Sequence, residues 1–330
     1  MFFHPSTILF FLFLIFSLIM MVSMNSWFMI WFFIEMNLLS FIPLILLKKN
    51  KYSIESSLKY FFIQTLSSIL ILIGLLMMFM NLEVYNYLFM SGLSIKLGLA
   101  PFHQWMVNIG ESLTWSLLGM LLTIQKIGPF LLFGYILKYN YNNIYIIYLI
   151  SLICMFFGSL GGLFTSSLRK IMVFSSISHS SWMILGIVMY IDLWVFYFSF
   201  YSLILFSVLV IFYKFNISNL NHMYLSLNFV ISFSLGINLL SMGGMPPMSG
   251  FVPKFILMKE FFLCHNYFIL FFLLMGVFIS LFFYCRMFIF NFIYMMSKNL
   301  FLKSKFKEVW PSLYINSSGL ILIPLMMYFY

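Results

Sequence analysis

Four ionisable residues lie within long apolar stretches of this 330-residue sequence. They are one acid and three lysines: Glu35, Lys96, Lys126 and Lys254. On membrane-insertion scales, a charge at the centre of a spanning helix costs about 2.5–3.5 kcal/mol, so four unpaired charges would cost about 10 kcal/mol or more. These side chains must therefore face protein, water or one another. Intramembrane groups of this kind are typical of proton pathways.

The ratio of acid to lysine favours proton exchange over a structural role. Helix-locking ion pairs are the alternative, but one carboxylate leaves at least two lysines without an acidic partner. Removing an amine from water disfavours its charged form, so a buried lysine can exchange its proton. A carboxylate ~6 Å from an ammonium contributes about 2.8 kcal/mol at an effective dielectric constant of ~20. We therefore predict that Glu35 and Lys96 form a switchable proton-loading pair, with Lys126 and Lys254 as relay and exit.

Two histidines are candidates to extend this path. Lys96 and His103 are seven residues apart, which predicts that they share one helix face. His103 is then either a relay or a hydrogen-bonded packing residue. His179 lies in the serine-rich run 175–181, whose hydroxyls could hold a chain of waters. A relay and a satisfied polar core residue both fit His179 equally well.

Other chemistries fail on residue spacing. The three cysteines, Cys154, Cys264 and Cys285, are too few and too scattered for a disulfide framework or an iron–sulfur cluster. The histidines occur one per apolar segment, without the paired ligands of a haem-binding bundle. No glycine-rich nucleotide-binding motif follows a predicted strand. The sequence therefore predicts no cofactor and no metal in this chain.

The composition predicts the elements that position these residues. Of all residues, 64% are hydrophobic and 7% are charged, against about 25% charged in soluble domains, which excludes a water-soluble or disordered chain. The runs are continuously apolar rather than alternating, which favours spanning helices over a β-barrel. We predict an all-α polytopic membrane protein with about eleven spans. They lie near residues 6–24, 25–47, 56–80, 88–108, 113–138, 143–165, 171–190, 192–213, 224–264, 267–292 and 310–330.

The distribution of charge predicts the orientation. The loops after the second, sixth, eighth and tenth spans hold most of the cations: Lys48, Lys49, Lys51, Arg169, Lys170, Lys214, Lys298, Lys303, Lys305 and Lys307. The opposite loops hold essentially Lys138, Glu83 and Asp192. The N-terminus is therefore expected on the positive-inside face. The net charge of +10 then reflects topology and contact with anionic lipid, and no nucleic-acid partner is expected.

A five-helix period is a further feature of the chain. We predict a single membrane domain, 1–330, with a first repeat at 6–138, a second at 143–292 and a C-terminal helix at 310–330. An odd number of helices per repeat places the second copy upside down in the membrane. The fourth member of each repeat is interrupted by glycine and proline. This predicts two discontinuous helices and a site near the membrane midplane.

Five motifs in a fixed order carry a family resemblance. They are WFFIEMNLLSFIP at 31–43, KYFFIQ at 59–64, KLGLAPFHQW at 96–105, QKIGP at 125–129 and GGMPPMSGFVPK at 243–254. Together they resemble the subunit 2 family of the mitochondrial NADH:ubiquinone oxidoreductase, respiratory complex I, of arthropod type. That family belongs to the antiporter-like membrane subunits. Two positions depart from its pattern, because Ser181 stands where glycine is usual and Phe255 where tryptophan is usual.

The resemblance implies a core subunit of the membrane arm, which translocates protons across the mitochondrial inner membrane. By position, Glu35 and Lys96 are its input pair, Lys126 its central lysine and Lys254 the lysine of its second broken helix. NADH, FMN, iron–sulfur clusters and ubiquinone are then bound by other chains of the complex. The implied partners are those subunits, above all neighbouring antiporter-like ones, and lipids such as cardiolipin.

Two alternatives stay open at this point. A stand-alone cation/proton antiporter of related fold needs acidic ligands for its metal ion, and Glu35 is the one acid available. A structural spacer in a membrane assembly would need no transfer of protons at all.

Overall fold

Helices form the regular secondary structure of the described part of the chain. The structure is a computed structural model, and it describes residues 5–47, 50–81, 84–139, 144–220, 229–296, 313–314 and 316. Eight helical stretches among them are long and apolar enough to cross a membrane. These described residues contain no strand, and one isolated β-bridge is present. The predicted all-α polytopic membrane class is confirmed.

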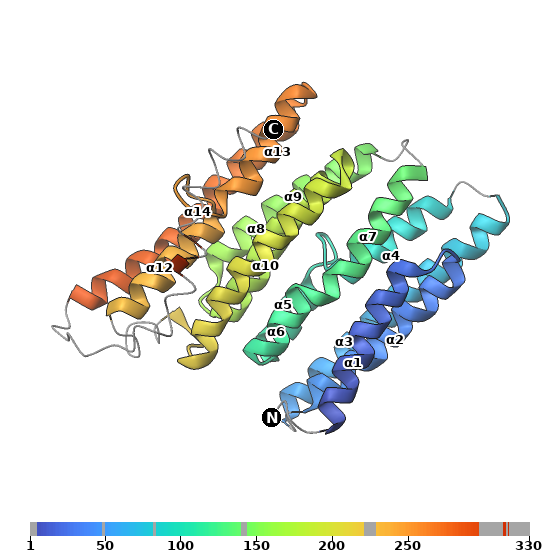
Figure 1. Cartoon of the computed structure of the whole chain (residues 1–330), viewed down its shortest axis with the longest axis horizontal. Coiled ribbons are helices and arrows are strands. Elements are labelled where there is room, and N and C mark those ends of the chain that lie inside the picture. The colour runs from blue at the N-terminus through green and yellow to red at the C-terminus, as the bar shows by residue number, and fades with distance from the viewer. Residues whose placement is uncertain are drawn as a thin grey trace. The chain divides into compact units, whose positions relative to one another are not determined.

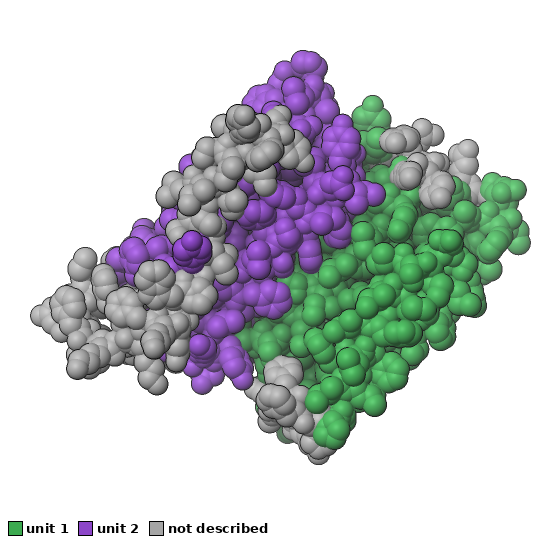
Figure 2. Space-filling model, in the orientation of Figure 1, with its two compact units in different colours: residues 1–147 green, residues 148–330 purple. Residues whose placement is uncertain are grey.

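The chain divides into two compact units, Met1–Ile147 and Tyr148–Tyr330 (Figures 1 and 2). Unit 1 contains α1 (Pro5–Ser23), α2 (Trp27–Leu46), α3 (Lys51–Phe79), α4 (Tyr85–Leu97), α5 (Gln104–Ser112), α6 (Trp115–Leu122) and α7 (Ile124–Tyr139). Helix α8 (Ile144–Phe164) contains the boundary. Unit 2 contains α9 (Leu168–Met189), α10 (Ile191–Lys214), α12 (Phe229–Gly243), α13 (Phe251–Leu263) and α14 (Tyr267–Met296). The boundary falls close to the gap between the two predicted repeats, whose inverted relation stays a prediction.

Seven predicted spans correspond to single helices, namely α1, α2, α3, α8, α9, α10 and α14. The spans predicted at 88–108 and 224–264 are each two shorter helices, as expected for discontinuous elements. The span at 113–138 is also divided, at Thr123, where the sequence analysis expects one helix. Thr123 Oγ1 donates to the Gly119 carbonyl at 2.8 Å, and such back-bonding bends helices. The span predicted at 310–330 lies almost wholly outside the described residues.

The serine-rich helix α9 is the most buried spanning helix of unit 2. Of its most apolar 18-residue window, 94% is buried, against 44% for α10 and α14. Each of its buried serines donates to the backbone carbonyl three residues earlier: Ser175, Ser176, Ser178, Ser180 and Ser181. This back-bonding satisfies the hydroxyl donors inside the helix. A water beside these serines would therefore meet mainly acceptor oxygens.

Arg286 is an intramembrane cation to which the sequence analysis assigns no role. It lies on α14, and its guanidinium donates to the carbonyls of Leu163 at 2.7 Å, Thr165 at 3.1 Å and Gly162 at 3.4 Å. These carbonyls end α8 and have no helical partner. A cation at a helix C-terminus also complements the helix dipole. Arg286 therefore stabilises the end of α8.

The chain segments on either side of α9 and α10 meet at one end of unit 2. Ser167 and Asn219 form an antiparallel bridge, and Leu168 N donates to Ser218 O at 3.0 Å. Lys170 lies in the first turn of α9, and Lys214 is the last residue of α10. The structure thus places these two cations at the same end of the unit, as the positive-inside pattern predicts.

Candidate functional site

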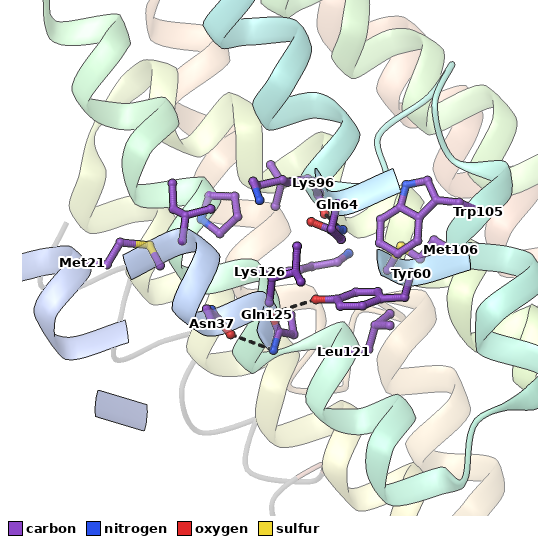
Figure 3. Close-up of a pocket in the computed structure, with 14 residues that line it drawn as sticks. Met21, Asn37, Tyr60, Gln64, Lys96, Trp105, Met106, Leu121, Gln125 and Lys126 are labelled. Atoms are coloured by element: carbon purple, nitrogen blue, oxygen red, sulfur yellow. Dashed lines mark hydrogen bonds between the residues drawn. The ribbon is translucent and has the colours of Figure 1, made fainter. Parts of the chain in front are cut away.

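A cavity of about 30 Å³ in unit 1 is lined by both Lys96 and Lys126 (Figure 3). One water needs roughly 10–15 Å³ of such volume, so the cavity has room for about two waters. Lys96 is 9% exposed and Lys126 is 2% exposed. Figure 3 shows Tyr60, Gln64 and Gln125 around Lys126, which gives the cavity polar walls. The structure therefore brings two of the four predicted proton carriers together.

Lys96 is positioned by the end of α4. Gly98 follows the helix in the left-handed conformation (φ 64°), and its N–H donates to Ile95 O at 3.0 Å. The indole N–H of Trp105 also donates to Ile95 O, at 3.0 Å, and the Gln64 amide donates to Lys96 O at 3.5 Å. Neutral groups thus satisfy these terminal carbonyls. The Lys96 ammonium, which lies in the last turn where a helix dipole favours a cation, has no hydrogen-bond partner among the described residues and faces the cavity.

Lys126 lies in the first turn of α7, directly after the division at Thr123. Its backbone N–H donates to Thr123 O at 3.0 Å. Pro129 lies inside the helix, and because proline has no N–H, it leaves the Gln125 carbonyl without its usual helical donor. The helix next to Lys126 therefore lacks one backbone hydrogen bond. A helix N-terminus does not favour a cation. The helix dipole therefore favours the charged form at Lys96, in a last turn, and disfavours it at Lys126, in a first turn.

The structure contains a chain of hydrogen bonds beside Lys126 that we did not predict from the sequence. The Tyr60 hydroxyl donates to Gln125 Oε1 at 3.4 Å, and Gln125 Nε2 donates to Asn37 Oδ1 at 3.0 Å (Figure 3). The chain connects α3, α7 and α2 through side chains that do not carry a net charge. The sequence feature that could have predicted this chain is the presence of three polar residues in otherwise apolar spans. Asn37 lies two residues after Glu35 and Gln125 directly before Lys126, whereas nothing in the sequence connects Tyr60 to this cluster.

Glu35 is half-buried on α2, two residues before Asn37. Its carboxylate is within electrostatic range of Lys96. The two groups nevertheless form no ion pair within 4.0 Å in the described structure. The predicted loading pair is thus close but not in contact, and Glu35 does not line the cavity.

His103 does not share a helix face with Lys96, so that expectation is wrong. Helix α4 ends at Leu97, and α5 begins at Gln104 with His103 as its N-cap. The intervening residues are not helical, because Gly98 turns the chain out of the helix. His103 is half-buried and is not part of the cavity wall.

Lys254 lies in the first turn of α13, in unit 2. It is 3% exposed, and its ammonium donates to the Gly243 carbonyl at 2.7 Å. Gly243 is the last residue of α12. The lysine therefore reaches back across the break and binds the C-terminal end of the preceding helix, where a cation is favourable.

His179 is buried in the same unit and shares a 2.8 Å hydrogen bond, through Nδ1, with the Tyr197 hydroxyl. Both residues line a small cavity of about 10 Å³, which has room for about one water. Ser241 and Pro253, from the two sides of the α12–α13 break, line it too. The structure therefore places His179 beside the second break.

The described residues contain no group of three or more His, Cys, Asp or Glu side chains that could hold a metal ion. Cys154 is buried, Cys285 half-buried and Cys264 exposed, and all three are free thiols.

Comparisons with known proteins place the chain in a family. Residues 23–280 match the transmembrane family of the NADH:quinone oxidoreductases and Mrp antiporters. The NADH-ubiquinone oxidoreductase chain 2 of Anopheles gambiae is 39% identical over 96% of this chain and 96% of its own length. The protein of that name from Artemia franciscana is 37% identical over 74% of this chain and 76% of its own length.

Solved structures share the fold at low sequence identity. Respiratory complex I from Thermus thermophilus contains a chain with a TM-score of 0.78 and 18% identity, which covers 98% of this chain and 78% of that one. The Mrp complex from Dietzia sp. DQ12-45-1b contains one with a TM-score of 0.72 and 14% identity. This match covers 89% of the present chain and 60% of the chain in the Mrp complex.

The family match covers most of the chain, and the Anopheles relative agrees with it over nearly its full length. This chain therefore belongs to the NADH:quinone oxidoreductase/Mrp antiporter transmembrane family.

Proposed function

We propose that this chain is a proton-translocating membrane subunit of an NADH:ubiquinone oxidoreductase in the mitochondrial inner membrane. The relatives named NADH-ubiquinone oxidoreductase chain 2 support the complex and the compartment. The chain works with the other subunits of that complex. Electron transfer from NADH to ubiquinone takes place in those subunits and drives the proton movement here.

The observation that carries this proposal is the cavity shared by Lys96 and Lys126. A proton leaves the Lys96 ammonium, passes through about two waters and binds the neutral amine of Lys126. Glu35 provides the control, because an ionised carboxylate close to an ammonium favours the charged form of that ammonium. When that charge moves or is neutralised, Lys96 releases its proton more easily.

The Asn37–Gln125–Tyr60 chain holds the waters in place. Amides and a phenol can donate to and accept from water, but in this setting they store no charge. Gln125 uses one amide hydrogen on Asn37 and keeps the other. The chain therefore orients waters next to Lys126 without competing for the proton.

In unit 2 we assign the exit to Lys254 and a relay role to His179. The hydrogen bond between Lys254 and Gly243 O supports an ammonium at this position. The 2.8 Å bond from His179 to Tyr197 supports a fixed imidazole that can accept and return a proton. His103 is given no part in the path, since it lies outside the cavity wall. Anionic lipids such as cardiolipin are assigned to the cation-rich face.

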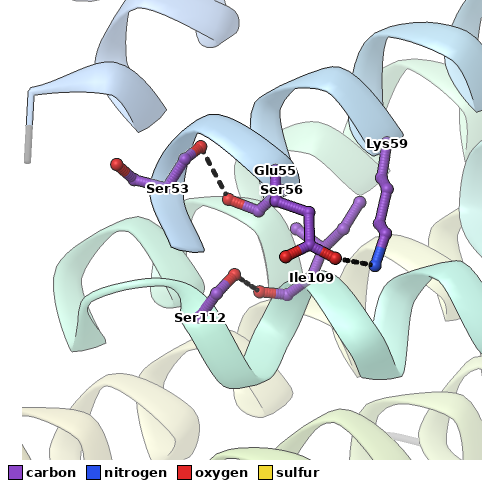
Figure 4. A network of polar contacts seen from close by, with 6 residues as sticks. All are labelled: Ser53, Glu55, Ser56, Lys59, Ile109 and Ser112. Atoms are coloured by element: carbon purple, nitrogen blue, oxygen red, sulfur yellow. Dashed lines mark hydrogen bonds and ion pairs between the residues drawn. The ribbon is translucent and has the colours of Figure 1, made fainter. Parts of the chain in front are cut away.

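The test is Lys126→Met in the intact complex, reconstituted in lipid vesicles. We expect the number of protons moved per NADH oxidised to fall, because the acceptor amine in the cavity is gone. The matched control is Lys59→Met. Lys59 is exposed on α3 and pairs with Glu55 at 2.6 Å (Figure 4). An exposed pair of this type contributes about 0.3–0.5 kcal/mol, so its loss leaves pumping unchanged. Equal proton yields from both variants would contradict the relay.

The two alternatives predict different results in the same preparation. A stand-alone antiporter would purify without a flavoprotein complex. A structural spacer would keep its full proton yield after Lys96→Ala.

A further inference from the structure

Asn316 is a fully buried residue at the α12–α13 break, and nothing in the proposed path involves it. It belongs to the C-terminal part of the chain and is 0% exposed. Its carboxamide oxygen accepts from Ser241 Oγ at 2.6 Å and from Ser249 Oγ at 3.4 Å. Its carboxamide nitrogen donates to Asn238 Oδ1 at 2.6 Å and to Ser207 Oγ at 3.5 Å. One side chain therefore contacts α10, α12 and the segment that connects α12 to α13.

The backbone of Asn316 adds a contact to the same segment. Ser249 N donates to Asn316 O at 3.1 Å. The connecting segment is thus held by one main-chain and one side-chain bond, while the last two turns of α12 are held by Asn238 and Ser241. All four partners are buried. Asn316 therefore ties the end of α12 to the segment that leads into α13.

This tie is close to the Lys254 site. Gly250, at the start of α13, packs so closely on α12 that a Cβ there would collide with the Ser241 carbonyl oxygen. Ser241 is two residues from Gly243, whose carbonyl accepts the Lys254 ammonium. The position of Lys254 relative to its acceptor thus depends on how tightly the two half-helices are held together.

We propose that Asn316 is a positioning residue that holds the α12–α13 break together, so that the Lys254 ammonium stays on the Gly243 carbonyl. A buried asparagine with a purely local role would satisfy its amide within its own segment. Asn316 instead uses its carboxamide oxygen on both Ser241 of α12 and Ser249 of the connecting segment, and its carboxamide nitrogen on Asn238 of α12 and Ser207 of α10. The transport part of this proposal rests on the proposed role of Lys254, whereas the holding part does not.

The holding role is tested by the reactivity of a cysteine in the break. Met245→Cys places a thiol in the half-buried connecting segment, and Cys264→Ser removes the exposed native thiol. In the intact complex we expect Asn316→Leu to raise the rate of N-ethylmaleimide labelling at position 245 about tenfold, because opening of the break becomes easier. Asn291→Leu is the matched control. Asn291 is an equally buried asparagine on α14, and it donates to Ser232 O at 2.7 Å, away from the break.

Equal labelling rates in Asn316→Leu, Asn291→Leu and the parent would overturn the proposal. If Asn316→Leu does not assemble, Ser241→Ala decides, because it removes the 2.6 Å bond with little change in volume. Its control is Ser234→Ala, a buried serine of α12 that bonds Ile231 O alone among the described residues. Faster labelling in Ser241→Ala alone supports the holding role, and equal rates overturn it.

The pH profile of proton translocation then tests the link to Lys254. We expect this profile to shift in Asn316→Leu and not in Asn291→Leu. If Asn316→Leu is labelled faster but its pH profile does not shift, the proposal that Asn316 positions Lys254 would be overturned. Unchanged pumping in Lys254→Met would instead count against the proposed function, and the labelling result would still stand.

Discussion

The two broken helices end in the same way but use their lysines differently. Helix α4 and helix α12 are each followed by a left-handed glycine, Gly98 at φ 64° and Gly244 at φ 81°. In each, the next N–H donates to a carbonyl five residues earlier, Leu99 to Ser94 O at 3.0 Å and Met245 to Leu240 O at 3.3 Å. This is the Schellman arrangement, which ends a helix and satisfies two of its last carbonyls.

The difference lies in which group satisfies the remaining carbonyls. At the first break Gln64 donates to Lys96 O and Trp105 gives Ile95 O a second donor, so the Lys96 ammonium is left for the cavity. At the second break the Lys254 ammonium itself binds Gly243 O. A proton can therefore leave Lys96 without disturbing the backbone, whereas a change of charge on Lys254 alters a bond that connects two half-helices. In the proposed path, the first break therefore transfers the proton and the second couples transfer to conformation.

The largest expected effect is on stability when each lysine is removed. Lys254→Met leaves the buried Gly243 carbonyl without its donor, which costs about 1–3 kcal/mol. Lys96→Met removes a buried cation that makes no hydrogen bond in the described structure, so we expect no loss of stability. Thermal unfolding of the purified complex, followed by a thiol-reactive dye, measures the difference. Proton yield per NADH should fall in both variants.

Equal losses of thermal stability in the two variants would show that the breaks do not differ as described. Lys59→Met is again the control for loss of a lysine on the exposed surface.

A smaller effect is expected when the two capping glycines are replaced. A residue with a Cβ in the left-handed conformation costs roughly 1–2 kcal/mol, so Gly98→Ala and Gly244→Ala should destabilise the complex to a similar degree. Their neighbours differ, however. A Cβ at position 244 would lie 2.8 Å from Lys254 Nζ, while at position 98 it would lie 2.8 Å from the Met106 sulfur.

Gly244→Ala should therefore displace the Lys254 ammonium and change the pH profile of proton translocation. Gly98→Ala should leave that profile unchanged, because its nearest contact is a flexible methionine. The profile is measured on reconstituted complex at matched expression. If the pH profile shifts by the same amount in Gly98→Ala, the capping glycine of the first break would not be independent of Lys96 as described.

Only part of the difference between the two broken helices could be predicted from the sequence. Hydropathy and charge placement predict the helical class and the buried lysines, because lipid leaves few alternatives to a chain with 7% charged residues. Glycine and proline predict the two broken spans. The apolar pattern does not predict which carbonyl a lysine binds, since that depends on tertiary contacts such as Lys254 with Gly243. For the same reason the Asn37–Gln125–Tyr60 chain, the capping role of Arg286 and the contacts of Asn316 are absent from the sequence analysis. The shared helix face expected for Lys96 and His103 fails because one glycine ends the helix between them.

The smallest expected effect concerns the neutral donor of the first break. Trp105→Phe removes the indole N–H that donates to Ile95 O at 3.0 Å, and we expect a loss of about 0.5–1.5 kcal/mol in thermal unfolding. Trp182→Phe is the matched control, because the buried indole N–H of Trp182 has no hydrogen-bond partner among the described residues. Both changes remove the same atoms, so the difference between them isolates the hydrogen bond to the helix end. Ile95 O would keep the Gly98 N–H as its donor but lose its second donor. If neutral donors hold the first break, Trp105→Phe alone should also slow pumping, since this oxygen could then compete with the cavity waters for the Lys96 ammonium. Proton yield that stays equal in both variants would mean that Lys96 keeps its position without this support.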